Sequence, residues 1–208
     1  MYGHAFFYAP AANTFTDVDA GQTLTYAATG MPPGVAFNPG TRSFSGTATQ
    51  AGEFLITLTA TDNGTPNLSV QDTMLFIITP APLIAQASDA SRAYGNVNPA
   101  LTGTLSGLKN GDNITASYST AASASSPVST YAITPSLNDP DAKLGNYSVT
   151  LNNGTLTVTP RPLTVAANPQ SKVYGDADPA LTYTADPLVV GDSFSGALVR
   201  APGENVGS

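Results

Sequence analysis

Three aspartates in the N-terminal part of the sequence are the side chains best suited to bind a ligand. Asp17 and Asp19 stand two positions apart in a loop-like segment, and Asp62 follows an alternating segment that could return to the same end of a β-domain. Calcium takes six to eight oxygen ligands, preferably carboxylates and carbonyls from closely spaced positions. The three aspartates therefore form a candidate calcium site.

The same aspartates have a simpler interpretation. Asp in a loop most often caps a turn by accepting hydrogen bonds from backbone amides, and Asp62-Asn63-Gly64 has the composition of a turn. An EF-hand is excluded, because the twelfth position from Asp17 is Ala28 and not Glu. Both interpretations, ion ligand and turn cap, remain open.

The composition argues against catalysis. His4 is the single histidine and there is no cysteine, which excludes His/Cys zinc sites and leaves a Ser-His-Asp triad without support. A net charge of −7 argues against nucleic acid, because phosphate contacts need clustered Lys and Arg. The longest wholly apolar run, Met74 to Ile78, is far shorter than the roughly 20 residues of a spanning helix. We expect no enzyme, no nucleic acid and no membrane insertion.

The elements that must position any site are β-strands. Only 10% of the residues are charged, against 41% hydrophobic, and Thr and Ser supply the polar faces, which suits a pleated sheet better than a helix. Alternation and turn residues predict short strands in the first segment, namely 24–28, 35–38, 43–47, 54–60 and 70–79. Turns at such close spacing indicate a β-sandwich. The fold class is all-β.

The rest of the chain is a repeat with a period of 80 residues. The residues that recur 80 positions later are Pro82, Leu83, Ser91, Tyr94, Gly95, Pro99, Ala100, Leu101, Thr102, Thr104, Leu108, Gly111 and Asp112. Closely spaced prolines mark the two boundaries, at 79–82 and 159–162, and favour stiff, extended connectors. We predict three small modules in tandem, at 1–80, 81–160 and 161–208.

The second module has a clear closing element, and the third lacks it. Asn152-Asn153-Gly154 between two alternating segments predicts a hairpin of strands 147–151 and 155–159. The third module ends before any equivalent of that hairpin. We therefore expect the sequence to be a piece of a longer protein, with an open strand edge in residues 162–208 that is mobile or pairs with another chain.

Two dipeptides recur with the repeat. Tyr94-Gly95 and Tyr174-Gly175 mark either a ligand pocket or a tyrosine packed beside a glycine of unusual backbone conformation, and the second interpretation is preferred. Gly111-Asp112 and Gly191-Asp192 are interpreted as hairpin ends. The aromatic N-terminus, Tyr2 to Tyr8, is interpreted as a strand that supplies core residues, with a sugar platform as the alternative.

The first module resembles the dystroglycan-type cadherin-like domain of bacterial surface proteins, also catalogued as a "putative Ig" domain. The segments that carry the resemblance are Asn13 to Gly21, Leu24-Thr25-Tyr26, Phe44 to Thr47, Gly52, Thr59 to Asp62 and Asp72-Thr73. Cadherin-like modules often bind calcium at their ends. The resemblance thus implies calcium as a cofactor and assigns Asp17, Asp19 and Asp62 as its ligands.

The second and third modules resemble the MBG repeat of YGX type. The match is carried by Tyr94-Gly95, Tyr174-Gly175, Asn146-Tyr147 and the segment Asn153 to Val158. The resemblance implies mostly-β modules, grasp-like or Ig-like in topology, within long exported bacterial proteins.

These features together predict a non-catalytic stalk or adhesion segment of a large bacterial protein that is secreted or held at the cell surface. A stalk gains reach by repeating one unit. The expected partners are other surface proteins, glycans or like chains. Two alternatives are a carbohydrate-binding accessory module of a secreted polysaccharide-degrading protein, which the lack of Trp disfavours, and a filament subunit that self-associates through the open edge of residues 162–208.

Overall fold

In a computed structural model, residues 1–17 and 21–203 are described, and they are almost wholly strand and turn. The single helical element among them is a three-residue 3₁₀ turn, η1 (Leu144–Asn146), so the expected all-β class is confirmed. No helix in this part of the chain has the length and hydropathy needed to cross a membrane. The described residues form two compact units, the first with Met1–Ser88, Leu101–Ser119 and Ile133–Gly154, the second with Asp89–Ala100, Thr120–Ala132 and the chain from Thr155 on.

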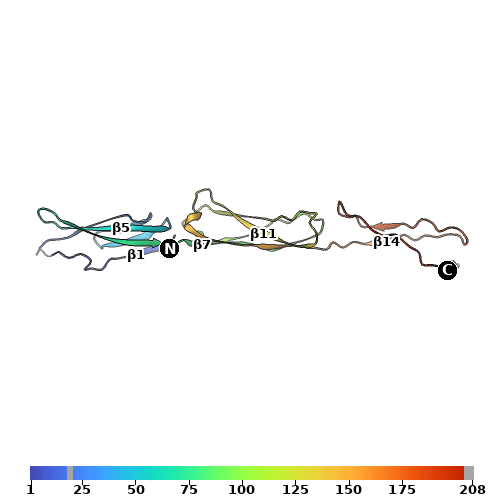
Figure 1. Ribbon diagram of the computed structural model, residues 1–208, viewed down its shortest axis with the longest axis horizontal. Helices are drawn as coiled ribbons and strands as arrows, with labels where there is room; N and C mark the ends of the chain where they lie inside the picture. The colour runs from blue at the N-terminus through green and yellow to red at the C-terminus, as the bar shows by residue number, and fades with distance from the viewer. Residues whose placement is uncertain (18–20, 204–208) are drawn as a thin grey trace. The chain divides into compact units, whose positions relative to one another are not determined.

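The N-terminal part of the first unit is a sandwich of two three-stranded antiparallel sheets (Figure 1). One sheet has the order β1-β4-β3 and the other β2-β5-β6. Their bounds are β1 (Ala5–Tyr8), β2 (Thr25–Thr29), β3 (Val35–Asn38), β4 (Ser43–Thr47), β5 (Gly52–Thr61) and β6 (Ser69–Ile78). All five strands expected in this segment are present, with shifts of one or two residues at their ends.

The core of the sandwich is built from the inward faces of these strands. In β5, Ile56, Leu58 and Ala60 are buried while the residues between them are more exposed, which is the alternation of a strand with one covered face. Phe44 of β4 is fully buried, with its ring centroid 4.8 Å from that of Phe37 and 5.1 Å from that of Phe76. Phe44 and Phe76 are buried and Phe37 is partly buried, so the packing of these three rings makes the cluster a main source of stability.

The 81–159 segment contributes a second group of strands to the first unit. The sheet β12-β7-β9 joins β12 (Tyr147–Asn152) in parallel to β7 (Ala81–Ala87), which pairs antiparallel with β9 (Gly103–Ser106). Strand β10 (Thr115–Ser119) pairs antiparallel with β11 (Ser129–Asn138). Alternate residues of β7 are buried along its whole length.

The proline-rich boundary at 79–82 is part of the folded structure. Ala81 is fully buried and begins β7, so the chain enters the next sheet without a free linker. Pro82 lies opposite Ser148 of β12, and the pairing with β9 begins only at Ile84. Pro82 therefore lacks a partner strand on one side, a position where its missing N–H is tolerated.

The predicted hairpin at 152–154 is wrong. β12 pairs with β7, whereas β13 (Gly154–Thr159) pairs in parallel with β8 (Ala90–Ala93), and the two belong to different sheets. The segment between β12 and β13 thus carries the chain from one sheet to another, as does the segment between β7 and β8. Gly154 is needed for this crossing, because a Cβ there would lie 2.6 Å from the carbonyl oxygen of Ser88.

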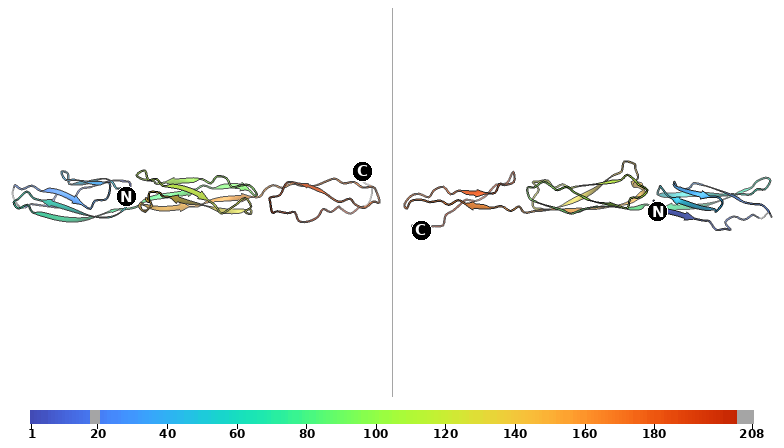
Figure 2. Two further views of the ribbon diagram at one scale, coloured as in Figure 1. Left: turned by 90° about the horizontal axis from the view of Figure 1, so that it is seen from above. Right: turned by 180° about the vertical axis from the view of Figure 1, so that it is seen from behind.

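The third segment contributes two short strands to the second unit. β14 (Val165–Ala167) pairs antiparallel with β15 (Tyr183–Ala185), and Figure 2 shows them side by side in orange and red. The hydrogen bond from the Asp186 amide to the carbonyl oxygen of Thr164, 3.0 Å, extends this ladder by one step. The expectation that residues 162–208 are mobile or pair with another chain stays a prediction.

Candidate functional site

The structure describes two of the three candidate calcium ligands. Asp19 lies outside the described residues, while Asp17 and Asp62 line one cavity of about 220 Å³ together with Thr16 and Ser69. The sequence argument that the two loops meet at one end of the module therefore agrees with the geometry of this pair. Among residues 1–17 and 21–203, no group of three or more acidic, His or Cys side chains is arranged to hold a metal ion.

Asp62 caps a turn in the way the simpler interpretation expects. Its Oδ1 accepts hydrogen bonds from the backbone amides of Gly64 at 3.0 Å and Leu68 at 2.9 Å. The Asn67 side chain donates to the Asp62 carbonyl oxygen at 2.8 Å. One carboxylate oxygen of Asp62 thus orders the loop between β5 and β6. Asp62 therefore caps a turn, and these two hydrogen bonds use only one of the two oxygens of its carboxylate.

A second polar cluster lies at the boundary between the first and second predicted modules, within the first unit. The hydroxyls of Tyr2 and Tyr147 both donate to Oδ2 of Asp112, at 2.7 and 2.6 Å. The two rings meet edge to face with centroids 5.3 Å apart, and the backbone amide of Lys109 donates to the Tyr147 hydroxyl at 2.9 Å. One carboxylate therefore joins tyrosines that are 145 positions apart in the sequence.

Burial and hydrogen bonding keep both tyrosines neutral. Burial, followed by the hydrogen bond to Asp112, raises the pKa of Tyr147 far above its usual value of 10.0. Burial is also the main cause that raises the pKa of Tyr2. A neutral hydroxyl is a donor, which is what the Asp112 carboxylate requires.

Side-chain bonds to the backbone join the two modules around this cluster. The Asn110 side chain donates to the carbonyl oxygen of Ala48 at 3.4 Å, and the Asn146 side chain accepts from the Ala51 amide at 2.9 Å. Gly3 has a φ of 67°, and a Cβ there would lie 2.4 Å from the Cβ of Lys109. A glycine is therefore required both by the turn and by the close approach of the next module.

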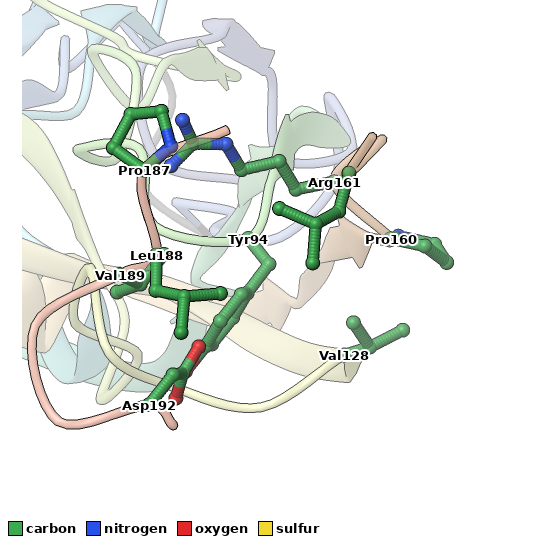
Figure 3. A pocket seen from close by; sticks show the side chains of 9 residues that line it. Tyr94, Val128, Pro160, Arg161, Pro187, Leu188, Val189 and Asp192 are labelled. Atoms are coloured by element: carbon green, nitrogen blue, oxygen red, sulfur yellow. The ribbon is translucent and has the colours of Figure 1, made fainter. Parts of the chain in front are cut away.

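A related cluster lies in the second unit at the boundary between the second and third predicted modules. The Tyr94 hydroxyl donates to Oδ1 of Asp192 at 3.0 Å, and this hydrogen bond raises the pKa of Tyr94. Figure 3 shows the Tyr94 ring extending toward Asp192 with Leu188 beside it. Residues here also line a cavity of about 280 Å³, with Pro160 and Arg161 from the proline-rich boundary on its wall.

Glycine has the same role in this second cluster. Gly95 has a φ of 84°, and a Cβ there would lie 2.4 Å from Cγ2 of Val189. The preferred interpretation of Tyr94-Gly95, a tyrosine beside a glycine of unusual conformation, therefore holds for this copy. Gly111-Asp112 is not a hairpin end, because β9 before it and β10 after it belong to different sheets.

A buried cation supports the Tyr94 turn from inside the second unit. Arg92 of β8 is 7% exposed and donates to the Asn98 side chain at 2.7 Å and to the carbonyl oxygen of Ser123. In the next repeat the corresponding positions are Lys172 and Asp178, which form an exposed ion pair at 2.6 Å. The acceptor of the basic side chain is thus a neutral amide, Asn98, in the second module and a carboxylate, Asp178, in the third.

Sequence reasoning noticed the residues of both clusters but not their pairing. Tyr94 and Asp112 recur as Tyr174 and Asp192, at the same 80-residue spacing as the rest of the repeat. The missing clue was that a tyrosine of one module bonds the aspartate of the next module, 98 positions later. A repeat period shows which residues are equivalent, and gives no information on which copies touch.

Comparison with protein families gives two matches that follow one another along the chain. The model described as "MBG domain (YGX type)" matches residues 83–157 and 163–208. The model described as "Putative Ig domain" matches residues 2–81. The first model alone covers more than half of the chain.

Curated relatives include the protein named "Serine-rich adhesin for platelets" of Staphylococcus aureus. In strain MSSA476 it is 28% identical over 137 residues, which are 60% of this chain and 6% of that protein. In strain N315 it is 30% identical over 114 residues, or 49% of this chain and 5% of that protein. The chain thus spans about 6% or less of the length of these relatives.

Solved structures with some likeness are cadherin ectodomains. Mouse cadherin-23 EC22-24 is 18% identical, with a TM-score of 0.30 over 65% of this chain and 54% of that one. Drosophila N-cadherin EC1-4 is 11% identical, with a TM-score of 0.30 over 68% of this chain and 41% of that one. Scores of this size do not establish a common fold.

Proposed function

Because this chain belongs to the MBG domain family of YGX type, with a domain of the "Putative Ig" family ahead of its MBG repeats, we propose that it is a non-catalytic stalk segment of a bacterial surface adhesin. Its three modules are residues 1–80, 81–160 and 161–208. They act as spacers that hold a binding region away from the cell surface, and their partners are other surface molecules.

The observation that carries this proposal is the continuous core of the first unit. Buried residues of the sandwich, among them Phe76 and Ile78, form one cluster with Ala81, Leu83 and Tyr147 of the next module. A spacer must resist bending where its modules meet, and a shared apolar core at that boundary supplies this resistance. An enzyme would need instead a cleft with paired reactive groups.

Small-angle X-ray scattering of residues 1–208 tests the stalk. A compact body of this length has a radius of gyration of roughly 17 Å. Three modules in series, each about as long as a ten-residue strand at about 3.3 Å per residue, form a rod of about 100 Å with a radius of gyration of about 30 Å. We expect the larger radius of gyration, at low and at high salt concentration alike. A value near that of a compact body contradicts the proposal.

We propose further that calcium binds at the end of the first module. The cavity lined by Asp17 and Asp62 is also lined by Thr16 and Ser69, so its wall combines two carboxylate residues with two hydroxyl residues. Oxygen ligands of this kind suit calcium and not a softer metal. Calcium would supply charge neutralisation and would fix the loop before β2 to the loop after β5. Asp19, from the same loop, is the proposed third acidic ligand.

Thermal unfolding with millimolar calcium and with chelator tests this site. Ligand at about ten times its dissociation constant adds about 1.4 kcal/mol, which raises the midpoint of an ~80-residue domain by several degrees. We expect that rise in the native chain and its loss in the double variant Asp17→Ala, Asp19→Ala. Asp72→Ala, on the exposed part of β6, removes one carboxylate away from the cavity and should keep the rise. Equal midpoints with and without calcium in the native chain would leave these aspartates as turn caps.

The two alternative functions have no such support in the geometry. A carbohydrate platform at the N-terminus would need several exposed aromatic rings, whereas Tyr2 is 1% exposed and Phe6 packs against the core, which leaves only Phe7 and Tyr8 of this group exposed. Filament formation through residues 162–208 stays a prediction.

A further inference from the structure

The same four-residue turn occurs three times in the described chain. The amide of His4 donates to the carbonyl oxygen of Met1, that of Asn96 to Ala93 and that of Asp176 to Val173, at 3.2, 3.2 and 3.1 Å. The central pair of each turn is Tyr-Gly, and the three glycines have φ values of 67°, 84° and 89°. The sandwich module and both MBG modules thus present one common turn.

In the first two copies the turn lies beside the last strand of its own module. The Tyr2 amide donates to the carbonyl oxygen of Thr79 at 2.8 Å, and the Tyr94 amide donates to that of Thr159 at 2.9 Å. Thr79 and Thr159 are the first residues of the two proline-rich boundaries. The Tyr-Gly turn therefore lies where the chain leaves one module for the next.

The partner of each of these two turns is also a repeated element. Lys109 to Asp112 and Val189 to Asp192 are equivalent turns, each closed by a bond from the aspartate amide to the first carbonyl, 3.0 Å in both. Each aspartate carboxylate accepts the tyrosine hydroxyl of the preceding module. The first residue of each of these turns, Lys109 or Val189, lies close to the glycine of the Tyr-Gly turn. A Cβ built on that glycine would be 2.4 Å from the side chain of Lys109 or Val189.

The third copy has the turn without the partner. Tyr174 is 70% exposed and Val173 is 72% exposed, whereas Tyr2 is 1% exposed. A Cβ built on Gly175 meets nothing within 4 Å. The glycine at this position keeps its positive φ, and the close approach that demands a glycine in the other two copies is absent within the described chain.

We infer that the Tyr174-Gly175 turn is a docking surface for the Gly-Asp turn of another MBG-type module, with the Tyr174 hydroxyl donating to its aspartate. Two occupied copies in this chain show what covers such a turn, and the third copy has the same backbone. This inference deepens the proposed stalk and rests on its serial order of modules. The docking surface and the stalk can fail separately, because X-ray scattering measures the length of the chain, whereas nitration of Tyr174 reports on one turn.

The chain itself supplies the partner for a test. Residue 208 is equivalent to residue 128, so appending a copy of residues 129–208 after Ser208 continues the repeat in register. The appended copy of Asp192 then follows Tyr174 by the same 98 positions that separate Tyr94 from Asp192. Nitration by tetranitromethane, measured by peptide mass spectrometry, reports the accessibility of the Tyr174 and Tyr94 hydroxyls in the native and extended chains, provided that the appended copy carries Tyr174→Phe so that its peptide differs in mass.

We expect nitration of Tyr174 to slow by about fivefold or more in the extended chain, the factor that one net hydrogen bond is worth. Asp192→Ala in the appended copy should restore the native rate. Gly175→Ala should restore it too, because its Cβ would obstruct the docked turn, while the same substitution leaves the rate in the native chain unchanged. Tyr94 in the same samples, already bonded to Asp192, serves as the internal reference for folding.

Equal nitration of Tyr174 in the native and extended chains, with Tyr94 protected in both, overturns the inference. So does protection of Tyr174 that survives both substitutions. A second measurement needs no extension: Gly95→Ala and Gly175→Ala place alanine at φ values of 84° and 89°, so their backbone strain is matched. Gly95→Ala should lower the unfolding midpoint more, because only Gly95 faces a neighbouring module, and equal effects contradict the docking role of the turn.

Discussion

Truncation of Phe44 to alanine is expected to lower the free energy of unfolding of the first module by about 3–5 kcal/mol. The Phe44 ring is fully buried and lies edge to face with Phe76, at a centroid distance of 5.1 Å. Its removal leaves a cavity between the two sheets, which β3 and β6 cannot close without losing their own pairing.

Phe7→Ala is the matched control for this prediction. Phe7 belongs to β1, which pairs with β4, but its ring is 73% exposed, so its loss should change the free energy by no more than about 0.5 kcal/mol. Urea unfolding followed by hydrogen exchange of peptides from β3 and β4 isolates this module from the rest of the chain. A Phe44→Ala effect as small as that of Phe7→Ala would contradict the packed aromatic core.

Substitution of Asp112 by alanine is expected to cost about 2–4 kcal/mol, because the hydroxyls of Tyr2 and Tyr147 lose their shared acceptor and an unmet buried donor costs about 1–3 kcal/mol, while Tyr147 keeps a longer bond to the carbonyl oxygen of Lys109 at 3.3 Å. The effect should reach both sides of the module boundary. Hydrogen exchange should therefore quicken in β6 before the boundary and in β7 after it.

Asp192→Ala is the corresponding change at the second boundary, and it should cost less than about 1 kcal/mol. Asp192 accepts from a single tyrosine, Tyr94, which is only half-buried, so water can replace the lost bond. A third variant, the double change Tyr2→Phe, Tyr147→Phe, removes the donors along with the need for Asp112. An Asp112→Ala substitution in that background should cost little, and a full cost there would show that the carboxylate acts through other contacts.

The parts of the fold predicted correctly from the sequence are those with strong local patterns. Strand β5 alternates large apolar residues with Thr, and glycine and proline turns separate the strands near it. Family membership and the secreted or cell-surface location expected from it are confirmed by the two family matches and by the adhesin relatives.

The errors arise where small residues hide the pattern. β7 has a regular alternation of buried Ala81, Leu83, Ala85 and Ala87, but alanine gives little contrast in hydrophobicity and the flanking prolines indicated a connector. At 152–154 the Asn-Gly composition indicated a hairpin turn, but a single residue separates β12 from β13 and neither Asn153 nor Gly154 has a positive φ. Which strand lies next to β13 depends on long-range pairing with β8, and turn composition contains no information on that pairing.

The candidate site was predicted in part for a similar reason. Adjacent carboxylates in a loop are visible in sequence, and Asp17 and Asp62 do line one cavity. The tyrosine bonds to Asp112 and Asp192 join residues about 100 positions apart, across module boundaries that local patterns treat as ends. Only the equivalence of residues under the repeat could have suggested them.

The two parallel strand pairs of the second module have a mechanical consequence. Tyr147–Asn152 lie beside Ala81–Gln86, and Leu156–Thr159 lie beside Ala90–Ala93, with both strands of each pair running in the same direction. Tension that pulls on the start of β7 and on the end of β12 moves these two strands in opposite directions along their length, and the same holds for β8 and β13. The hydrogen bonds of each pair are then loaded together in shear and do not open one at a time as in a zipper.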